Sequence, residues 1–205
     1  MQASPAVHLV DDEMAVRDAL AFLLRSHGLP SRTYASGPAL LAALDAEALR
    51  GCIVLDVRME PMSGLQVHGE LLARGVLLPV LFLSGHGDIA MAVDALHSGA
   101  FDFIEKPFSD DALIERVERA LRLEAQAHVA RSEDERCLAR LASLTERERE
   151  VMTRVAAGKL NKVIADELAI VVRTVEVHRA RVFAKLGVRS APEVATLLAH
   201  YAGRY

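Results

Sequence analysis

At 205 residues the chain is long enough for two small domains, each with its own core. No apolar run approaches the ~20 residues of a membrane-spanning helix, the first residues do not resemble a signal peptide, and the two cysteines match no metal-binding spacing, so we expect a soluble, cytoplasmic protein without a membrane partner. The net charge of −4 is unevenly spread: residues 1–138 hold 12 Lys and Arg against 21 Asp and Glu, whereas residues 139–205 hold 12 against 7. The second part is therefore suited to contact phosphates.

The first part of the chain alternates short apolar runs, typical of strands, with amphipathic stretches, typical of helices. The expected strands are Val7–Val10, Arg32–Tyr34, Cys52–Leu55, Val80–Leu83 and Phe101–Ile104. The expected helices are Met14–His27, Pro38–Leu49, Leu65–Ala73, Ile89–His97 and a fifth that begins near Asp110. This alternation predicts an α/β doubly wound domain with a five-stranded parallel sheet, in which ligands bind outside the carboxyl ends of the strands.

Acidic and polar residues stand where the expected strands end. They are Asp11 and Asp12 after the first strand, Asp56 after the third, Ser84 after the fourth and Lys106 after the fifth. At one edge of a sheet the three carboxylates repel one another unless a cation neutralises them, and Mg²⁺ prefers such oxygen ligands and keeps several waters. We therefore expect Mg²⁺ here, with Lys106 balancing the charge of a phosphoryl group on Asp56 and Ser84 donating its hydroxyl to that group.

These residues resemble the receiver domain of response regulators, over residues 5–125. The resemblance implies that Asp56 takes a phosphoryl group from a histidine of a sensor kinase. It also implies a set of magnesium ligands: Asp12 and Asp56 directly, Asp11 through water, and the main-chain carbonyl of Arg58. Asp56 is thus the predicted phosphoacceptor and one of the metal ligands.

The same resemblance implies a conformational switch. Ser84 is drawn to the phosphoryl group and the aromatic ring of Phe103 rearranges with it, while the Lys106–Pro107 peptide bond is expected to be cis. The rearrangement remodels the face made by Ile89–His97 and Phe101–Ile104. We expect phosphorylation to cause homodimerisation through that face.

One residue near the predicted site departs from the receiver pattern. The family's usual proline, four places after the phosphorylated aspartate, is replaced by Glu60, with Pro61 beside it. Two interpretations stay open: Glu60 lies near the metal and adds repulsion, or it faces solvent. The choice affects the lifetime of the phosphoryl group and the affinity for magnesium.

From Ser109 to Ala157 the chain contains neither glycine nor proline. Apolar residues at helical spacing continue from Leu113 to Leu144, interrupted by the charged stretch Ser132–Arg136. Either the fifth helix extends into a linker helix, or the segment is a solvated, partly frayed connector. We assign residues 1–125 to the receiver domain, 126–138 to a helical linker and 139–205 to a second domain.

The last third of the chain is expected to be a separate all-α domain of four helices. Thr145 and Glu148 form a capping box at the start of the first helix, and Gly158 follows its end. The other expected helices are Asn161–Leu168, Arg173–Leu186 and one that opens at the capping box of Ser190 and Glu193 and ends near Tyr201. Short helices joined tightly in the middle of such a domain indicate a helix-turn-helix.

The expected helix Arg173–Leu186 has two different faces. Val175, His178, Val182, Phe183 and Leu186 gather on one side, and Arg173, Val177, Ala180, Arg181 and Ala184 point the opposite way, flanked by Thr174 and Glu176. Small side chains beside arginines suit the major groove of DNA, where arginine reaches guanine edges or phosphates. An ordinary solvated helix face is the alternative for this helix taken alone.

The surrounding motifs resemble the LuxR-type helix-turn-helix, over residues 139–203. They are Leu144–Met152, Ala157–Ala165, Arg173–His178 and Lys185–Gly187. With the receiver, the chain resembles a NarL/FixJ-type response regulator and is closest to the FixJ side. The resemblance implies that the helix from Arg173 reads the major groove, that Lys162 and Lys185 contact phosphates, that His178 packs rather than binds a metal, and that the final helix takes part in dimerisation.

Two positions depart from the LuxR-type pattern. The serine usual before the recognition helix is replaced by Val171-Val172, and Leu160 stands where serine is common. Loss of a hydroxyl N-cap costs ~1 kcal/mol of helix stability. Asn161 is a candidate substitute cap for its helix, and the hydroxyl of Thr174 is a candidate local donor.

Taken together, these features predict a two-component response regulator that binds double-stranded promoter DNA and activates transcription, with RNA polymerase as a further partner. Apart from slow self-dephosphorylation, we expect no enzyme activity. A phosphatase with Asp56 as nucleophile is an alternative, but such enzymes usually carry a second acid two residues on, where this chain has Arg58. A protein-interaction module whose helix-turn-helix has lost DNA binding is a further alternative.

Overall fold

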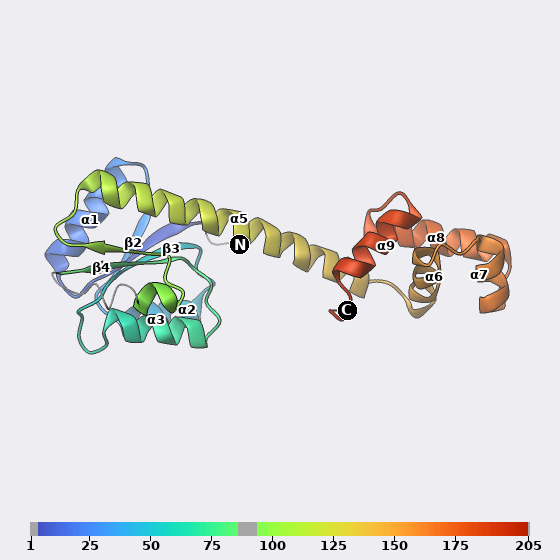
Figure 1. Ribbon diagram of the computed structural model, residues 1–205, viewed down its shortest axis with the longest axis horizontal. Helices are drawn as coiled ribbons and strands as arrows, with labels where there is room; N and C mark the ends of the chain where they lie inside the picture. The colour runs from blue at the N-terminus through green and yellow to red at the C-terminus, as the bar shows by residue number, and fades with distance from the viewer. Residues whose placement is uncertain (1–3, 86–93, 205) are drawn as a thin grey trace. The chain divides into compact units, whose positions relative to one another are not determined.

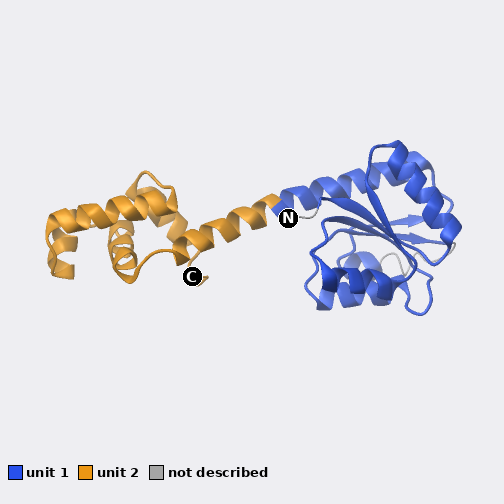
Figure 2. Ribbon diagram, turned by 180° about the vertical axis from the view of Figure 1, so that it is seen from behind, with its two compact units in different colours: residues 1–128 blue, residues 129–205 orange. Residues whose placement is uncertain are grey.

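The computed structural model describes residues 4–85 and 94–204 of the chain. The chain divides into two compact units, Met1–His128 and Val129–Tyr205, called unit 1 and unit 2 below (Figure 2). Each unit has its own buried apolar residues, and each is described by itself.

Unit 1 contains the predicted five-stranded parallel sheet, with strand order β2-β1-β3-β4-β5. Every residue of β1, β3 and β4 is buried, as expected for central strands that helices cover on both faces. β2, at one edge, has the more polar sequence and stays partly exposed. The strands are β1 (Ala6–Val10), β2 (Ser31–Tyr34), β3 (Gly51–Asp56), β4 (Val80–Ser84) and β5 (Asp102–Glu105).

Helices cover both faces of this sheet (Figure 1). α1 (Met14–Ser26) and the first part of α5 (Asp110–Ala142) pack on one face, and α2 (Gly37–Ala46) and α3 (Gly64–Ala73) pack on the other. α2 ends three residues before the predicted end at Leu49, because the chain becomes extended at Glu47 before it enters β3. Of the expected helix Ile89–His97, residues 89–93 lie outside the described residues, and residues 94–97 are helical.

α5 is continuous over 33 residues, so the structure favours the helical interpretation of the connecting segment. Its first part belongs to unit 1 and the remainder to unit 2. The two units meet in sequence at His128 and Val129, inside the predicted linker 126–138. The domain boundaries at 125 and 138 stay a prediction.

In unit 1, a buried ion pair attaches α5 to the sheet. The guanidinium of Arg50, just before β3, donates to both carboxylate oxygens of Glu124, with Nε–Oε1 and Nη2–Oε2 distances of 2.8 and 3.1 Å. Glu124 is only 2% exposed. Such a forked pair fixes both distance and orientation, so it sets the register of α5 against the start of β3.

Unit 2 contains the predicted helices: α6 (Glu146–Ala156), α7 (Asn161–Leu168), α8 (Val172–Leu186) and α9 (Ala191–His200). The capping box of Thr145 and Glu148 is present in both directions. At α9, Ser190 caps the helix, but the carboxylate of Glu193 accepts from the Arg189 main-chain N–H and the Ser190 hydroxyl. The tight turn between α7 and α8 passes through Ala169 in the left-handed region, at φ 51°.

The core of unit 2 includes the end of α5. Leu141 and Leu144 pack with apolar residues of α6, α8 and α9, among them Met152, Val182 and Val194. A second cluster joins α6, α7 and α8. The described part of the chain contains no helix that is both long and apolar enough to cross a bilayer.

Candidate functional site

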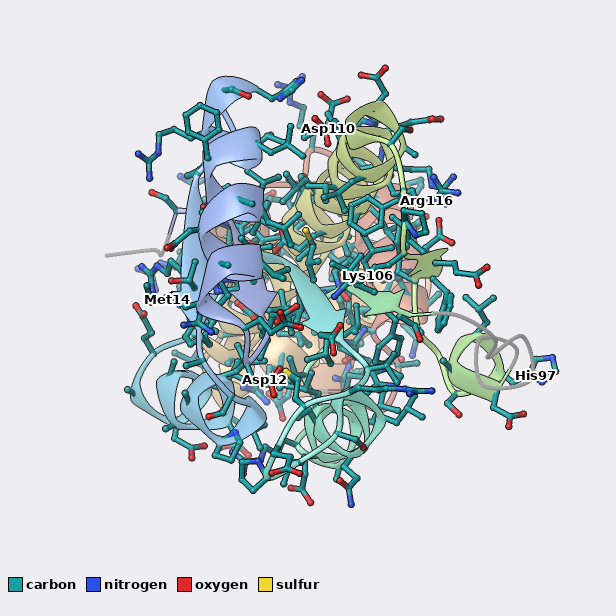
Figure 3. All side chains as sticks on the ribbon, turned by 90° about the vertical axis from the view of Figure 1, so that its left-hand side faces the viewer. Asp12, Met14, His97, Lys106, Asp110 and Arg116 are labelled. Atoms are coloured by element: carbon teal, nitrogen blue, oxygen red, sulfur yellow. The ribbon has the colours of Figure 1, made fainter. Side chains whose placement is uncertain are left out.

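Residues from three strand ends meet at one edge of the sheet in unit 1. The ammonium of Lys106, after β5, lies 2.7 Å from Oδ1 of Asp56 at the end of β3 and 3.3 Å from Oδ2 of Asp11 after β1. Asp11 and Asp56 are buried, at 3% and 7% exposure. Figure 3 shows Lys106 and Asp12 at the same end of the sheet. The sequence prediction that these strand ends converge is therefore correct in geometry.

Main-chain groups hold the two buried carboxylates in place. Oδ2 of Asp56 accepts from the N–H of Arg58 at 2.8 Å, and Oδ1 of Asp11 accepts from the N–H of Glu13 at 2.9 Å. Arg17, one turn into α1, donates to the main-chain oxygen of Asp11 at 2.7 Å. Sequence reasoning did not identify Arg17, whose signal is its position six residues after the first aspartate.

The start of α3 lies directly against the backbone of Asp56. A Cβ at Gly64 would be 2.2 Å from the main-chain oxygen of Asp56, so only glycine fits this approach. The N–H of Gly64 donates to the oxygen of Val57 at 2.9 Å. Residues 58–63 therefore form a loop whose two ends are joined, and we call the contact at Gly64 the neck of this loop.

The charges at this edge affect one another. Burial raises the pKa of the Asp56 carboxyl above its ordinary value, and the ammonium of Lys106 acts in the opposite direction. For Lys106, burial alone lowers the pKa, but the hydrogen bond and charge of Asp56 and the charge of Asp11 raise it above the ordinary value. Lys106 therefore stays charged at neutral pH and compensates part of the negative charge.

The two residues of the predicted switch lie on neighbouring strands. Ser84, at the end of β4, is 1% exposed, and its hydroxyl donates to the main-chain oxygen of Gly85 at 3.1 Å. Phe103 on β5 is half-buried against the apolar cluster under α2 and α3. The Lys106–Pro107 bond is cis, as predicted, and so is Glu60–Pro61.

Asp12, which follows Asp11 in the chain, and Glu60, in the loop after β3, are exposed and line one hollow of about 460 Å³. Within the described ranges, no three carboxylate, imidazole or thiolate groups converge as a complete protein-made metal site requires. Mg²⁺ does not require this, because it binds through one or two carboxylates and keeps several waters. The residues present therefore fit a largely hydrated magnesium ion, and Glu60 lines the same hollow as Asp12, one of the predicted ligands.

In unit 2, α8 presents the two faces that its sequence predicts. Val175, Val182 and Leu186 are buried, and His178 and Phe183 are half-buried. The predicted outward residues are exposed: Arg173, Glu176, Val177, Ala180, Arg181 and Ala184. Arg173, whose side chain is 85% exposed, donates to Glu176 at 3.2 Å. Thr174 is half-buried.

The two lysines predicted to contact phosphates have different surroundings. Lys162, in the first turn of α7, is exposed. The ammonium of Lys185 lies 2.6 Å from the carboxylate of buried Glu148 and 3.0 Å from the main-chain oxygen of Ser143. Glu148, which sequence reasoning identified only as a capping residue, thus also binds the end of α8. The role of Lys185 toward DNA stays a prediction.

The predicted substitute cap at α7 is wrong. Leu160 occupies the N-cap position of α7 without a side-chain hydrogen bond, and Val171 does the same at α8. Asn161 lies inside the helix, and its Oδ1 accepts from Nη1 of Arg179 at 3.1 Å. The oxygen that could have capped α7 therefore holds α7 against α8 instead.

Comparison with known proteins agrees with this description. Residues 7–118 match the response regulator receiver domain, and residues 142–198 match the bacterial regulatory proteins of the luxR family. The chain is 47% identical over 193 residues to the C4-dicarboxylate transport transcriptional regulatory protein DctR of Rhodobacter capsulatus, covering 93% of this chain and 98% of that protein. It is 45% identical over 190 residues to the transcriptional regulatory protein FixJ of Rhizobium meliloti, covering 92% of each.

Solved structures give the same result. The response regulator StyR superposes with a TM-score of 0.88 at 39% identity, over 97% of this chain and 100% of that one. Full-length FixJ from B. japonicum superposes with a TM-score of 0.59 at 39% identity, over 97% of each chain. The chain is a two-component response regulator with a receiver domain and a LuxR-type DNA-binding domain. Within that class it belongs to the NarL/FixJ-type transcriptional regulators.

Proposed function

We propose that this regulator accepts a phosphoryl group on Asp56 from a histidine of a sensor kinase, dimerises, and then binds promoter DNA to activate transcription by RNA polymerase in the cytoplasm. The observation that carries the proposal is the placement of Asp56 at the end of β3, with the ammonium of Lys106 at 2.7 Å. A buried carboxylate with a fixed cation beside it can react and then tolerate the added charge of a phosphoryl group.

Asp56 and the residues around it have different roles in this phosphoryl transfer. A carboxylate oxygen of Asp56 forms a bond to phosphorus as the phosphorus–nitrogen bond to the kinase histidine breaks, and the imidazole nitrogen takes up a proton. Lys106 offsets the added negative charge. Bound Mg²⁺ would supply further charge compensation, held by Asp12, Asp56 and the main-chain carbonyl of Arg58, with Asp11 acting through water.

The phosphoryl group on Asp56 would offer a new hydrogen-bond acceptor, and the rearrangement of Ser84 and Phe103 follows from it. The hydroxyl of Ser84, which donates to the Gly85 main-chain oxygen before transfer, turns to a phosphoryl oxygen, and Phe103 moves inward with it. This remodels the face that contains Phe101–Ile104, together with Ile89–His97, of which residues 89–93 lie outside the described residues. The proposed dimer forms through that face, and in unit 2 we propose that α9 also takes part in dimerisation.

Beryllofluoride, which mimics a phosphoryl group, tests this proposal on the full chain. With Mg²⁺, light scattering should show the mass doubling and the affinity for promoter DNA rising, because a dimer presents two copies of α8. The unchanged mass of an Asp56→Asn variant is the matched control. If the wild-type mass stays the same with and without beryllofluoride, the dimerisation mechanism is wrong.

On DNA, we propose that α8 lies in the major groove. Arg173, Thr174, Glu176, Val177 and Arg181 form the base-facing surface, and Lys162 and Lys185 contact phosphates. The exposure of the arginines beside small residues supports the reading role, and the exposure of Lys162 supports anchoring. A phosphatase role has less support, since Arg58 stands where such enzymes carry a second acid and the relatives are transcriptional regulators.

A residue that contacts bases and a residue that contacts phosphates should respond differently to substitution, and two variants test this. Lys162→Ala should weaken cognate and random DNA alike and reduce the slope of log affinity against log salt by about one. Arg181→Ala should cost ~1–3 kcal/mol on the cognate site and little on random DNA. The measurement is salt-dependent fluorescence anisotropy with the beryllofluoride-treated full chain.

The exposed Arg136→Ala variant, outside the helix-turn-helix, should bind both duplexes as the wild type does. If Arg181→Ala loses affinity in parallel on cognate and random DNA, Arg181 is an anchor rather than a reader. If neither Lys162→Ala nor Arg181→Ala loses affinity, the outward face of α8 does not contact DNA.

A further inference from the structure

The hollow beside the phosphorylation site carries negative charge from two separate parts of unit 1. Asp12 contributes from the end of β1, and Glu60 contributes from the loop between β3 and α3. Both side chains are exposed. The sequence interpretation left open whether Glu60 lies near the metal position, and the shared hollow is the observation that bears on it.

The four carboxylates at this edge are not equally compensated. For Asp11 and Asp56, both carboxylate oxygens accept from protein donors: Lys106, and the N–H groups of Glu13 and Arg58. For Asp12 and Glu60, no hydrogen bond or ion pair is found in residues 4–85 and 94–204. The negative charge of Asp12 and Glu60 is therefore the charge that an added cation would neutralise.

The hollow is large enough to hold a cation that keeps its water. A water molecule takes up about 30 Å³ in the liquid, so a shell of about six occupies roughly 180 Å³. The hollow measures about 460 Å³. Glu60 can therefore face a hydrated Mg²⁺ across water while Asp12 binds the ion directly, without the close convergence that a dehydrated ion demands.

We propose that Glu60 is an outer ligand of this chain's magnesium ion: its carboxylate accepts hydrogen bonds from the waters of a cation bound at Asp12. The inference rests on the proposed function and adds to it. It assigns to Glu60 a role that the proline usual at this position cannot have. The consequence is that the unphosphorylated receiver binds Mg²⁺ more tightly than it would with an uncharged residue there.

Arg58 is the opposing charge to consider, because it also lines the hollow. If its guanidinium neutralised Glu60, removal of the Glu60 charge would leave magnesium binding unchanged. The two arrangements therefore predict different affinities, which can be measured without any phosphoryl transfer.

The experiment is calorimetric titration of the unphosphorylated full chain with MgCl₂. Glu60→Gln should weaken binding about fivefold, because it removes one charge near a divalent ion across water. The difference should shrink as KCl is raised from about 0.05 to 0.5 M, because salt screens a solvent-separated interaction. Glu115→Gln, which removes an exposed charge from α5 outside the hollow, is the matched control and should bind as the wild type does.

Asp12→Asn tests the magnesium site itself, separately from the role of Glu60, because it should abolish most of the magnesium binding. If Asp12→Asn loses binding but Glu60→Gln matches the wild type, the role of Glu60 is wrong and the proposed function stands. If Asp12→Asn also binds as the wild type does, the magnesium site itself is misplaced. If Glu115→Gln weakens binding as much as Glu60→Gln, the effect is one of net charge and the inference is overturned.

Discussion

An Asp56→Asn variant is expected to acquire no phosphoryl label from acetyl phosphate and Mg²⁺, whereas the wild-type chain is labelled. The change replaces the attacking carboxylate by an amide of the same shape, whose oxygen is a much poorer nucleophile. The fold should survive, because the amide oxygen can still accept from the Lys106 ammonium, as Oδ1 of Asp56 does at 2.7 Å. Mass spectrometry of the intact chain measures the label, and circular dichroism checks the fold.

Asp45→Asn provides the control for this experiment. Asp45 lies on α2 with a side chain that is 69% exposed, and it pairs with Arg74, away from the strand ends. This variant should be labelled as the wild type is. Equal labelling of Asp56→Asn and the wild type would contradict the assignment of the phosphoacceptor.

A second large effect is expected at the opposite end of β3. Glu124→Ala should lower the free energy of unfolding of unit 1 by about 2–4 kcal/mol, because it leaves the Arg50 guanidinium without its forked partner. The lower end of this range reflects the 18% exposure of the Arg50 side chain, which lets water solvate part of the charge. Hydrogen exchange of the β1 and β3 amides reports the free energy of this unit alone.

The control lies on the same helix. Glu118 pairs with Arg122 at i and i+4, and its side chain is 48% exposed, so Glu118→Ala should change the free energy by less than about 0.5 kcal/mol. The double variant Arg50→Met/Glu124→Leu should recover most of the loss, since an apolar pair of similar volume avoids the unpaired charge. A loss below about 1 kcal/mol for Glu124→Ala would show that the pair does not hold α5.

Sequence patterns predicted the sheet and the convergence of its strand ends because both depend on local signals. Apolar runs such as those of β1, β3 and β4 identify buried strands, and parallel strands necessarily bring Asp11, Asp56 and Lys106 to one edge. The faces of α8 were predictable for the same reason, since helical periodicity separates buried from exposed positions.

Other contacts were out of reach of the sequence, because they join residues far apart in the chain. Arg50 and Glu124 are separated by 74 positions, and Lys185 and Glu148 by 37. No rule of sequence spacing predicts either ion pair. The prediction for Asn161 failed similarly: a local rule favoured capping, but Arg179, 18 residues away, binds the same oxygen.

The neck at Gly64 has a consequence for how this regulator can change over evolution. The contact of Gly64 with the backbone of Asp56, and its hydrogen bond to Val57, fix both ends of the 58–63 loop independently of the side chains between them. Substitutions within the loop can therefore alter the chemistry of the hollow without displacing Asp56, the proposed phosphoacceptor. Glu60 and Pro61 lie in this loop. Single substitutions there can change the charge that lines the hollow while the position of the Asp56 carboxylate is retained.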